Sequence, residues 1–215
     1  MTDTILFDLG NTLVRYYEMR DFPGILREAI TAAANAAGIV LDNAFWERVA
    51  AENFESPDCA VRPLEGRLRR ILALSEVKES VCRAFMTPLF AMAAVYDDAL
   101  PTLAALRDKG CRTAIVSNTP WGSPTALWRE ELARLGLAET VDCVVFCDDC
   151  GWRKPARQIF DRTLSLLNVK PARCLFIGDD PRWDIAGPEA QGIRAALVQH
   201  PQDSLPNLLR REGVL

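Results

Sequence analysis

Apolar residues follow two different spacings along this chain, and each spacing occupies its own part of the sequence. Residues 20–92 repeat apolar side chains every three or four positions, which is typical of helices, and contain no convincing strand. After about residue 97, helical segments alternate with short apolar runs. The runs that we interpret as buried strands are 5–7, 113–116, 141–147, 174–177 and 195–198. The helices expected between and after them are 101–109, 123–135, 155–167, 189–191 and 205–211.

This alternation predicts the fold class. Strands joined through helices pack as parallel neighbours, so we expect an α/β protein with a doubly wound, mostly parallel, Rossmann-like sheet. The helical stretch predicts a helical bundle inserted after the first strand, with Pro88 in the end region of its last helix. The expected organisation is an α/β core of residues 1–15 and 95–215 and a helical cap of residues 16–94.

The amino-acid composition argues against some classes of binding partner. The 215 residues carry a net charge of −4, which gives no basic surface for nucleic acid or for an anionic membrane. No apolar run approaches the length of a bilayer span and no basic-then-apolar leader is visible, so we expect a soluble, cytoplasmic chain. Seven cysteines, odd in number and irregular in spacing, fit a reducing compartment. No oligomeric state is predicted.

Two other kinds of centre are disfavoured. Cys143, Cys147 and Cys150 lack a second cysteine pair, so we interpret them as buried thiols rather than a zinc site. The only histidine, His200, stands in a Gln-His-Pro context typical of a surface turn. A Ser-His-Asp or Cys-His hydrolase, or a site with several histidine ligands, would have to be built around that one residue.

Polar groups stand directly after the predicted strands. In a parallel sheet with helices on both faces, the carboxyl ends of the strands line one cleft, so these groups are expected to meet although they lie far apart in sequence. Each alone has an ordinary structural explanation, such as a helix cap or a solvated lysine. The groups are Asp8, Ser117, Asn118, Lys154, Asp179, Asp180 and Asp184.

Together these groups predict a site for a phosphate and a cation. Carboxylates that converge from two strands repel one another unless a cation lies between them, and oxygen ligands favour Mg²⁺. Lys154 and the Ser117 hydroxyl would then bind a phosphate dianion. Asp8 would attack phosphorus and form an aspartyl-phosphate, which water later cleaves.

Four motifs in this order resemble the haloacid dehalogenase superfamily of hydrolases, most of which are phosphatases. The motifs are Asp8-Leu9-Gly10-Asn11-Thr12-Leu13, Ser117-Asn118-Thr119, Lys154-Pro155, and Gly178-Asp179-Asp180 with Asp184. The resemblance implies a helical cap after the first strand and a small phosphorylated metabolite as substrate. It assigns nucleophilic attack to Asp8, assistance and phosphate binding to Ser117 and Lys154, and further phosphate contacts to Gly10, Asn11 and Asn118. It assigns Mg²⁺ to Asp8, the Gly10 carbonyl, Asp179 and Asp184.

Gly10 departs from the pattern of the family's phosphatases. They usually carry a second aspartate two residues after the nucleophile, which protonates the leaving group and then activates water; here that residue is glycine. General acid–base assistance typically contributes ~10²–10⁴-fold, so we expect slow turnover of alkyl phosphates unless Asn11 or a cap residue substitutes. Turnover of acyl or aryl phosphates would be slowed less, because their leaving groups need little protonation.

Three alternatives stay open at this point. The chain could be an impaired member that binds a phosphorylated ligand or a protein partner. It could be a 2-haloacid dehalogenase, a class that also lacks the second aspartate and carries a Trp-Asp pair such as Trp183-Asp184. It could also be a phosphonatase, for which Lys78 is the only lysine between residues 15 and 92. Residues that could contact the far end of a substrate are Tyr16, Tyr17, Arg20, Arg62, Arg67, Arg69, Arg70 and Trp121.

Overall fold

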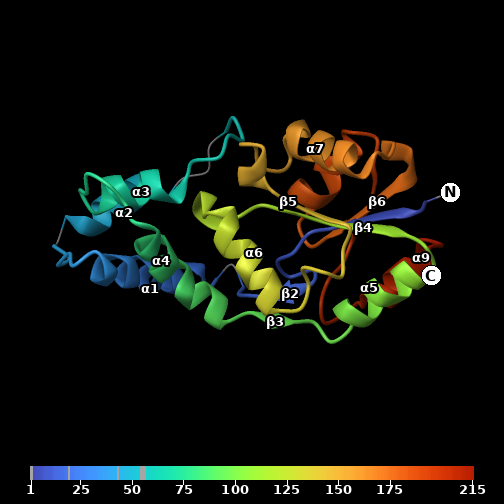
Figure 1. The fold of residues 1–215 in the computed structure, drawn as a ribbon, viewed down its shortest axis with the longest axis horizontal. Coiled ribbons are helices and arrows are strands. Elements are labelled where there is room, and N and C mark those ends of the chain that lie inside the picture. The colour runs from blue at the N-terminus through green and yellow to red at the C-terminus, as the bar shows by residue number, and fades with distance from the viewer. Residues whose placement is uncertain (1, 19, 43, 54–56) are drawn as a thin grey trace.

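A five-stranded parallel sheet forms the centre of the computed structural model, which describes residues 2–18, 20–42, 44–53 and 57–215 (Figure 1). The strands lie in the order β5-β4-β1-β6-β7. They are β1 (Thr4–Phe7), β4 (Arg112–Ser117), β5 (Cys143–Phe146), β6 (Cys174–Gly178) and β7 (Arg194–Leu197). The predicted α/β fold class is therefore confirmed. The apolar run 141–147 is longer than its strand, because the pairing with β4 begins only at Cys143.

Helices cover both faces of the sheet, because successive strand residues point to opposite sides. Leu6 and Phe176 pack with α7 (Arg157–Leu167), whereas Phe7 packs in the larger cluster with α5 (Ala99–Asp108) and α9 (Leu205–Arg211). Figure 1 shows α7 on one side of the sheet and α5 and α9 on the other. The remaining helices of this part are α6 (Thr125–Arg134) and the short α8 (Gly187–Glu189).

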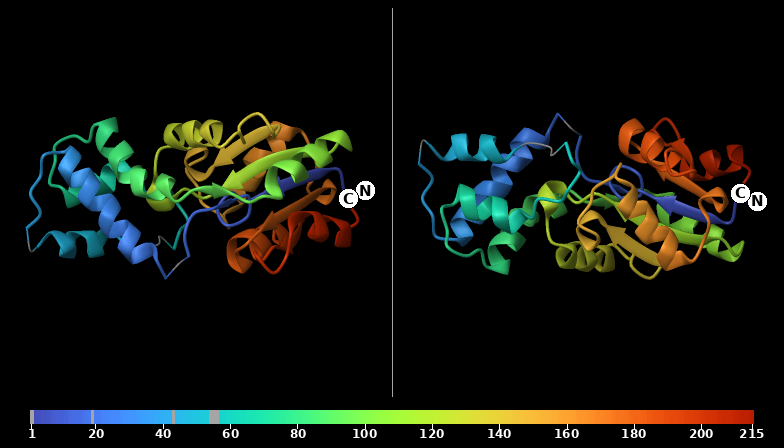
Figure 2. Two further views of the ribbon diagram at one scale, coloured as in Figure 1. Left: turned by 90° about the horizontal axis from the view of Figure 1, so that it is seen from below. Right: turned by 90° about the horizontal axis from the view of Figure 1, so that it is seen from above.

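Four further helices lie together beyond the carboxyl ends of the strands (Figures 1 and 2). We call them the helical bundle: α1 (Phe22–Ala36), α2 (Phe45–Glu52), α3 (Leu64–Ile71) and α4 (Glu79–Ala91). They follow the predicted apolar stripes, with the α1 stripe buried mainly against α4. Pro88 lies inside α4, and the helix continues to Ala91. The division into core and cap stays a prediction.

Two short strands that the apolar pattern did not predict join the bundle to the sheet. They are β2 (Val14–Arg15) and β3 (Ala94–Val95), which pair antiparallel. A strand of two residues is too short to show a hydrophobic period in the sequence. Because the two strands lie 79 to 81 positions apart, the local sequence does not predict their pairing. No helix in the described ranges is long and apolar enough to cross a membrane.

A third connection fastens the bundle to the α/β part. Ala60 forms an antiparallel bridge with Trp152, flanked by hydrogen bonds from Val61 N to Gly151 O (2.9 Å) and from Arg153 N to Cys59 O (2.8 Å). We call residues 59–62 the strap. Beside it, Gly122 has a φ of +65°, and a Cβ there would lie 2.2 Å from the carbonyl oxygen of Arg62.

This close approach predicts that Gly122→Ala destabilises the protein more than a matched glycine change. Gly136 has a similar φ of +72° but nothing within 4 Å of its added Cβ. Both alanines incur the left-handed backbone cost of about 1–2 kcal/mol, and only Gly122→Ala adds overpacking of ~1–3 kcal/mol. Urea unfolding of both variants measures the difference in unfolding free energy. Equal losses would contradict the close packing of Gly122 against the Arg62 carbonyl.

Candidate active site

Lys154 lies buried between two carboxylates at the carboxyl ends of the strands. Its Nζ is 2.6 Å from Asp8 Oδ1 and 2.6 Å from Asp184 Oδ1. Lys154 is 2% exposed, and Asp184 is 1% exposed. Since a buried ammonium is stable only when it is paired, these two contacts tie β1 to the segments after β5 and β6.

Asp8 reaches this position because β1 is the central strand. Phe7 pairs with Ile115 on one side and Ile177 on the other, so the three strands end almost level. The backbone N–H of Asp8 donates to Ile177 O at 2.9 Å. Ser117, at the end of β4, is 5% exposed, and its hydroxyl lies 3.4 Å from the carbonyl of Asn118. The predicted convergence of strand ends is present.

Asn118 positions Lys154 through its side chain. Its Oδ1 accepts a hydrogen bond from Lys154 N at 2.8 Å, and its Nδ2 donates to Lys154 O at 3.2 Å. Both ends of the amide are therefore engaged with the backbone of Lys154. The role of Asn118 in phosphate binding stays a prediction.

The turn after β6 places two further aspartates. Asp180 begins it by accepting hydrogen bonds at Oδ1 from Arg182 N (2.8 Å) and Trp183 N (2.9 Å). Its own N–H donates to Asp184 Oδ2 at 3.1 Å. Asp184 packs so closely on Gly178 that a Cβ there would lie 2.3 Å from the Asp184 carboxyl carbon. Gly178 is required at the end of β6 because it leaves room for that carboxylate.

Gly10 lies beside the carboxylate of Asp8 and could carry a Cβ without a close contact. A Cβ at this position would lie 4.0 Å from Asp8 Oδ2 and 3.9 Å from a ring carbon of Tyr16, both ordinary contact distances. Lys154 binds the other oxygen, Oδ1. Asn11 has a φ of 53°, and its side-chain Nδ2 donates weakly to Tyr17 O at 3.4 Å.

Asp8, Asp179 and Asp184 form a cluster suited to a divalent cation. Each can offer an oxygen within 4.8 Å of the others, and they are the one such group of three or more His, Cys, Asp or Glu found among the described residues. Burial, together with the charges of Asp8 and Asp184, raises the pKa of Asp179 to about 7. Burial lowers the pKa of Lys154, but the two aspartates outweigh it and raise that pKa, so the ammonium stays charged.

A second cation would relieve the repulsion that remains after Lys154 has neutralised one charge. An all-oxygen donor set is the kind that Mg²⁺ prefers. The three cysteines set aside as a zinc site are free thiols; Cys147 is buried, as predicted, whereas Cys143 and Cys150 are half-buried.

A cavity of about 980 Å³ adjoins the cluster, with Asn11 and Asp179 in its wall. The wall also holds His200, whose ring stacks on Tyr96 at 3.8 Å and whose Nε2 lies 3.2 Å from Thr12 O. His200 lies in a turn, as its Gln-His-Pro context predicts, and is partly exposed, with its ring packed in the cavity wall. Applying the strand-end rule to β7 would have found it, because it follows that strand by three residues.

The residues expected to contact the far end of a substrate separate into groups. Tyr16 and Tyr17 line this cavity. Trp121 is buried against α4, with Arg67 over its ring. The exposed Arg20 pairs with Glu18 at 2.9 Å. Arg62 pairs with Asp58, Arg70 pairs with Glu52, and Arg69 is exposed.

Comparisons with known proteins identify the family and support the fold. The family model of haloacid dehalogenase-like hydrolases matches residues 2–192. A ribulose-1,5-bisphosphate 5-phosphatase of Halopiger xanaduensis is 34% identical over 107 residues, covering 50% of this chain and 43% of the relative. A glyceraldehyde 3-phosphate phosphatase of Methanothermobacter thermautotrophicus is 35% identical over 109 residues, covering 51% and 46%. The chain thus spans about half the length of these curated relatives.

Solved structures extend the similarity over the whole fold. A HAD phosphatase from Thermococcus onnurineus superposes with a TM-score of 0.66 at 25% identity, covering 97% of this chain and 91% of that one.

The raised pKa of Asp179 predicts how stability depends on pH and on Mg²⁺. A carboxyl group with a higher pKa when folded binds its proton more tightly in the native state, so stability falls as pH rises from about 4 towards 7. We expect the melting temperature of the metal-free protein to be lower near pH 8 than near pH 5, and Mg²⁺ to raise it most near pH 8.

Thermal unfolding in chelator and in Mg²⁺ tests this expectation, with Asp179→Asn and the exposed Asp161→Asn as a matched pair. Asp179→Asn should flatten the pH dependence, and Asp161→Asn should leave it unchanged. A metal-free melting temperature that rises over the same interval would contradict the interpretation.

Proposed function

The chain belongs to the haloacid dehalogenase-like hydrolases, and we propose that it is a Mg²⁺-dependent phosphatase acting on a small phosphorylated metabolite through an aspartyl-phosphate on Asp8. The observation that carries this proposal is that the two oxygens of the Asp8 carboxylate have different neighbours. Lys154 holds Asp8 Oδ1, whereas Oδ2 lies 4.0 Å from the position that a Cβ on Gly10 would take. Two relatives that carry phosphatase names, for ribulose bisphosphate and glyceraldehyde 3-phosphate, support the substrate class.

Asp8 Oδ2 is the attacking atom in this proposal. It forms a bond to phosphorus while the ester P–O bond breaks, and the bonding pair leaves with the ester oxygen. Lys154 pairs with the Asp8 carboxylate and fixes its orientation through Oδ1. Water then attacks the aspartyl-phosphate, which releases inorganic phosphate and restores the carboxylate of Asp8.

Ser117 and Lys154 are proposed to bind the phosphoryl oxygens, with help from the main-chain N–H of Asn118 and the side chain of Asn11. The main-chain N–H of Asn11 is not a donor in this proposal, because it already donates to Val14 O at 2.7 Å. Ser117 lies at the end of the strand next to β1, and Asn118 is bonded to Lys154. A hydroxyl, an ammonium and N–H groups all donate hydrogen bonds, which matches an acceptor-rich dianion.

The proposed metal ligands are Asp8, Asp179 and the Gly10 carbonyl, with Asp184 close behind them. The donor set fits Mg²⁺, because the cluster holds three carboxylates, of which Asp8 and Asp184 share the single ammonium of Lys154. When bound, the ion would neutralise charge on the phosphoryl group. Lys154 has a separate task, because it holds Asp8 and Asp184 in place whether or not the ion is bound.

Gly10 restricts the substrates that this site turns over quickly. No side chain there can protonate the leaving oxygen, so the P–O bond must break without that assistance. We propose that aryl or acyl phosphates, whose leaving groups are stable anions, are better substrates than alkyl phosphates. The cavity beside Asp179, with aromatic surfaces from Tyr17 and Tyr96, is large enough for such a group.

A 2-haloacid dehalogenase is the second candidate, favoured by Gly10 together with Trp183-Asp184. In that reaction Asp8 would attack carbon, and no cation would be required. The raised pKa of Asp179 weighs against it, since it marks a carboxylate that benefits from a cation. Halide release from 2-haloacids, assayed beside a panel of phosphate esters with and without Mg²⁺, separates the two reactions.

Replacing Asp8 tests the nucleophile. Asp8→Asn removes the attacking carboxylate oxygen while keeping the size of the side chain, so hydrolysis of p-nitrophenyl phosphate in Mg²⁺ should fall by about 10³-fold or more. Asp161→Asn, which changes an exposed carboxylate on α7, should keep wild-type turnover. Turnover by Asp8→Asn close to that of the wild type would rule out covalent catalysis by Asp8.

Adding the missing carboxyl group tests the role of Gly10. A Cβ at Gly10 meets only ordinary contact distances, so Gly10→Asp should raise turnover of alkyl phosphates by about 10-fold to 10²-fold, and that of p-nitrophenyl phosphate less. Gly10→Asn is the matched control, because it has the same shape but cannot donate an acidic proton. Equal effects of the two substitutions would show that proton transfer does not limit the reaction.

A further inference from the structure

Trp121 projects into the helical bundle from the loop that carries Ser117 and Asn118. It lies in a short turn, Pro120–Gly122, and is 8% exposed. Its ring stacks on Phe85 of α4, with centroids 5.7 Å apart and planes 29° from parallel. The guanidinium of Arg67, from α3, lies over the same ring at 5.3 Å. Two bundle helices therefore hold one side chain of the loop that follows β4.

The backbone of this turn is held in a conformation that its residues do not favour alone. Trp121 has a φ of 56°, in the left-handed region that bulky side chains rarely adopt. Gly122, next to it, packs against the carbonyl of Arg62. Such strain persists only where surrounding contacts impose it, so the bundle imposes the shape of this loop.

The bundle also contacts the loop that carries Lys154. The strap pairs with residues 151–153, which directly precede Lys154. Asn118 then joins the two loops, because its amide bonds the backbone of Lys154 at both ends. Residues 59–67 thus contact both loops that carry the proposed phosphate-binding groups, one through the strap and one through Trp121.

We propose that Trp121 is a positioning residue: its seat between Phe85 and Arg67 holds the Ser117 and Lys154 loops in the arrangement that the reaction needs. This inference rests on the proposed phosphatase function for its effect on turnover. Its structural part, the ordering of the two loops by the bundle, is measurable without any turnover.

Trp121→Leu tests the proposal, because it keeps an apolar side chain and removes the stacking face. Amide hydrogen exchange in residues 117–122 and 151–154 should become about 10-fold faster, since the loops lose their seat. The kcat for p-nitrophenyl phosphate should fall about 10-fold while KM changes less than about 3-fold, because orientation is lost and binding is largely kept. Trp121→Phe, which restores an aromatic face, should recover most of both losses.

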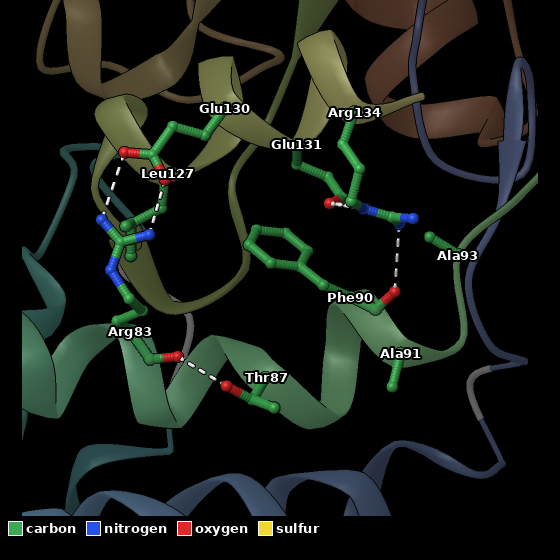
Figure 3. Close-up of a pocket in the computed structure, with 9 residues that line it drawn as sticks. All are labelled: Arg83, Thr87, Phe90, Ala91, Ala93, Leu127, Glu130, Glu131 and Arg134. Atoms are coloured by element: carbon green, nitrogen blue, oxygen red, sulfur yellow. Dashed lines mark hydrogen bonds and ion pairs between the residues drawn. The ribbon is translucent and has the colours of Figure 1, made fainter. Parts of the chain in front are cut away.

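Phe85→Leu and Phe90→Leu form a matched pair on α4. Phe85→Leu should reproduce the effects of Trp121→Leu, and the double variant should be no worse than either single change, because both remove one shared contact. Phe90 points from α4 towards α6 across a cavity of about 560 Å³ and contacts Trp128 instead (Figure 3). Phe90→Leu should therefore leave exchange in both loops and kcat near their wild-type values.

The outcomes separate this inference from the proposed function. Wild-type exchange in both loops of Trp121→Leu overturns the inference whatever the activity. Faster exchange with unchanged kcat also overturns it, as does a loss of kcat in Phe90→Leu equal to that in Trp121→Leu. If the wild-type protein hydrolyses no phosphate ester, the proposed function and the catalytic part of the inference fail, and hydrogen exchange decides the structural part.

Discussion

The ammonium of Lys154, buried between Asp8 and Asp184, is the interaction on which the rest of the site depends. Removing an ammonium from water costs several kcal/mol, so it is stable there only with charged partners in good geometry. Two contacts of 2.6 Å provide them. Those contacts in turn require Gly178 to make room for Asp184 and Asn118 to hold the backbone of Lys154. The site is therefore one coupled structure built from four separate segments of the chain.

Much of this arrangement could be predicted from the sequence, because it follows from one rule about parallel sheets. Buried strands appear as apolar runs, and the polar residues after them meet at one edge. Asp8, Ser117, Lys154 and Asp184 follow that rule, and the structure places them at that edge. The rule specifies where a residue lies along its strand. It does not specify what the side chain contacts once it arrives.

The features that sequence reasoning missed depend on such contacts. Asn118 lies at the expected strand end, but only the fold shows that its amide is occupied by Lys154. His200 resembles a turn residue locally, and its stack on Tyr96 joins positions 104 residues apart. The β2–β3 pair is equally non-local. Periodicity reports local structure and burial, so pairings between distant segments leave no comparable signal.

Gly10 replaces a residue with a chemical role, although the packing around it does not require a glycine. A glycine in this turn has an ordinary explanation in backbone flexibility, yet its φ is not in the left-handed region and its added Cβ meets nothing closer than 3.9 Å. Neither backbone conformation nor crowding therefore requires glycine there. What the glycine leaves out is a side chain next to Asp8 Oδ2, the oxygen that Lys154 does not hold. In the proposed reaction, a glycine at this position favours a substrate whose own leaving group makes the missing proton unnecessary.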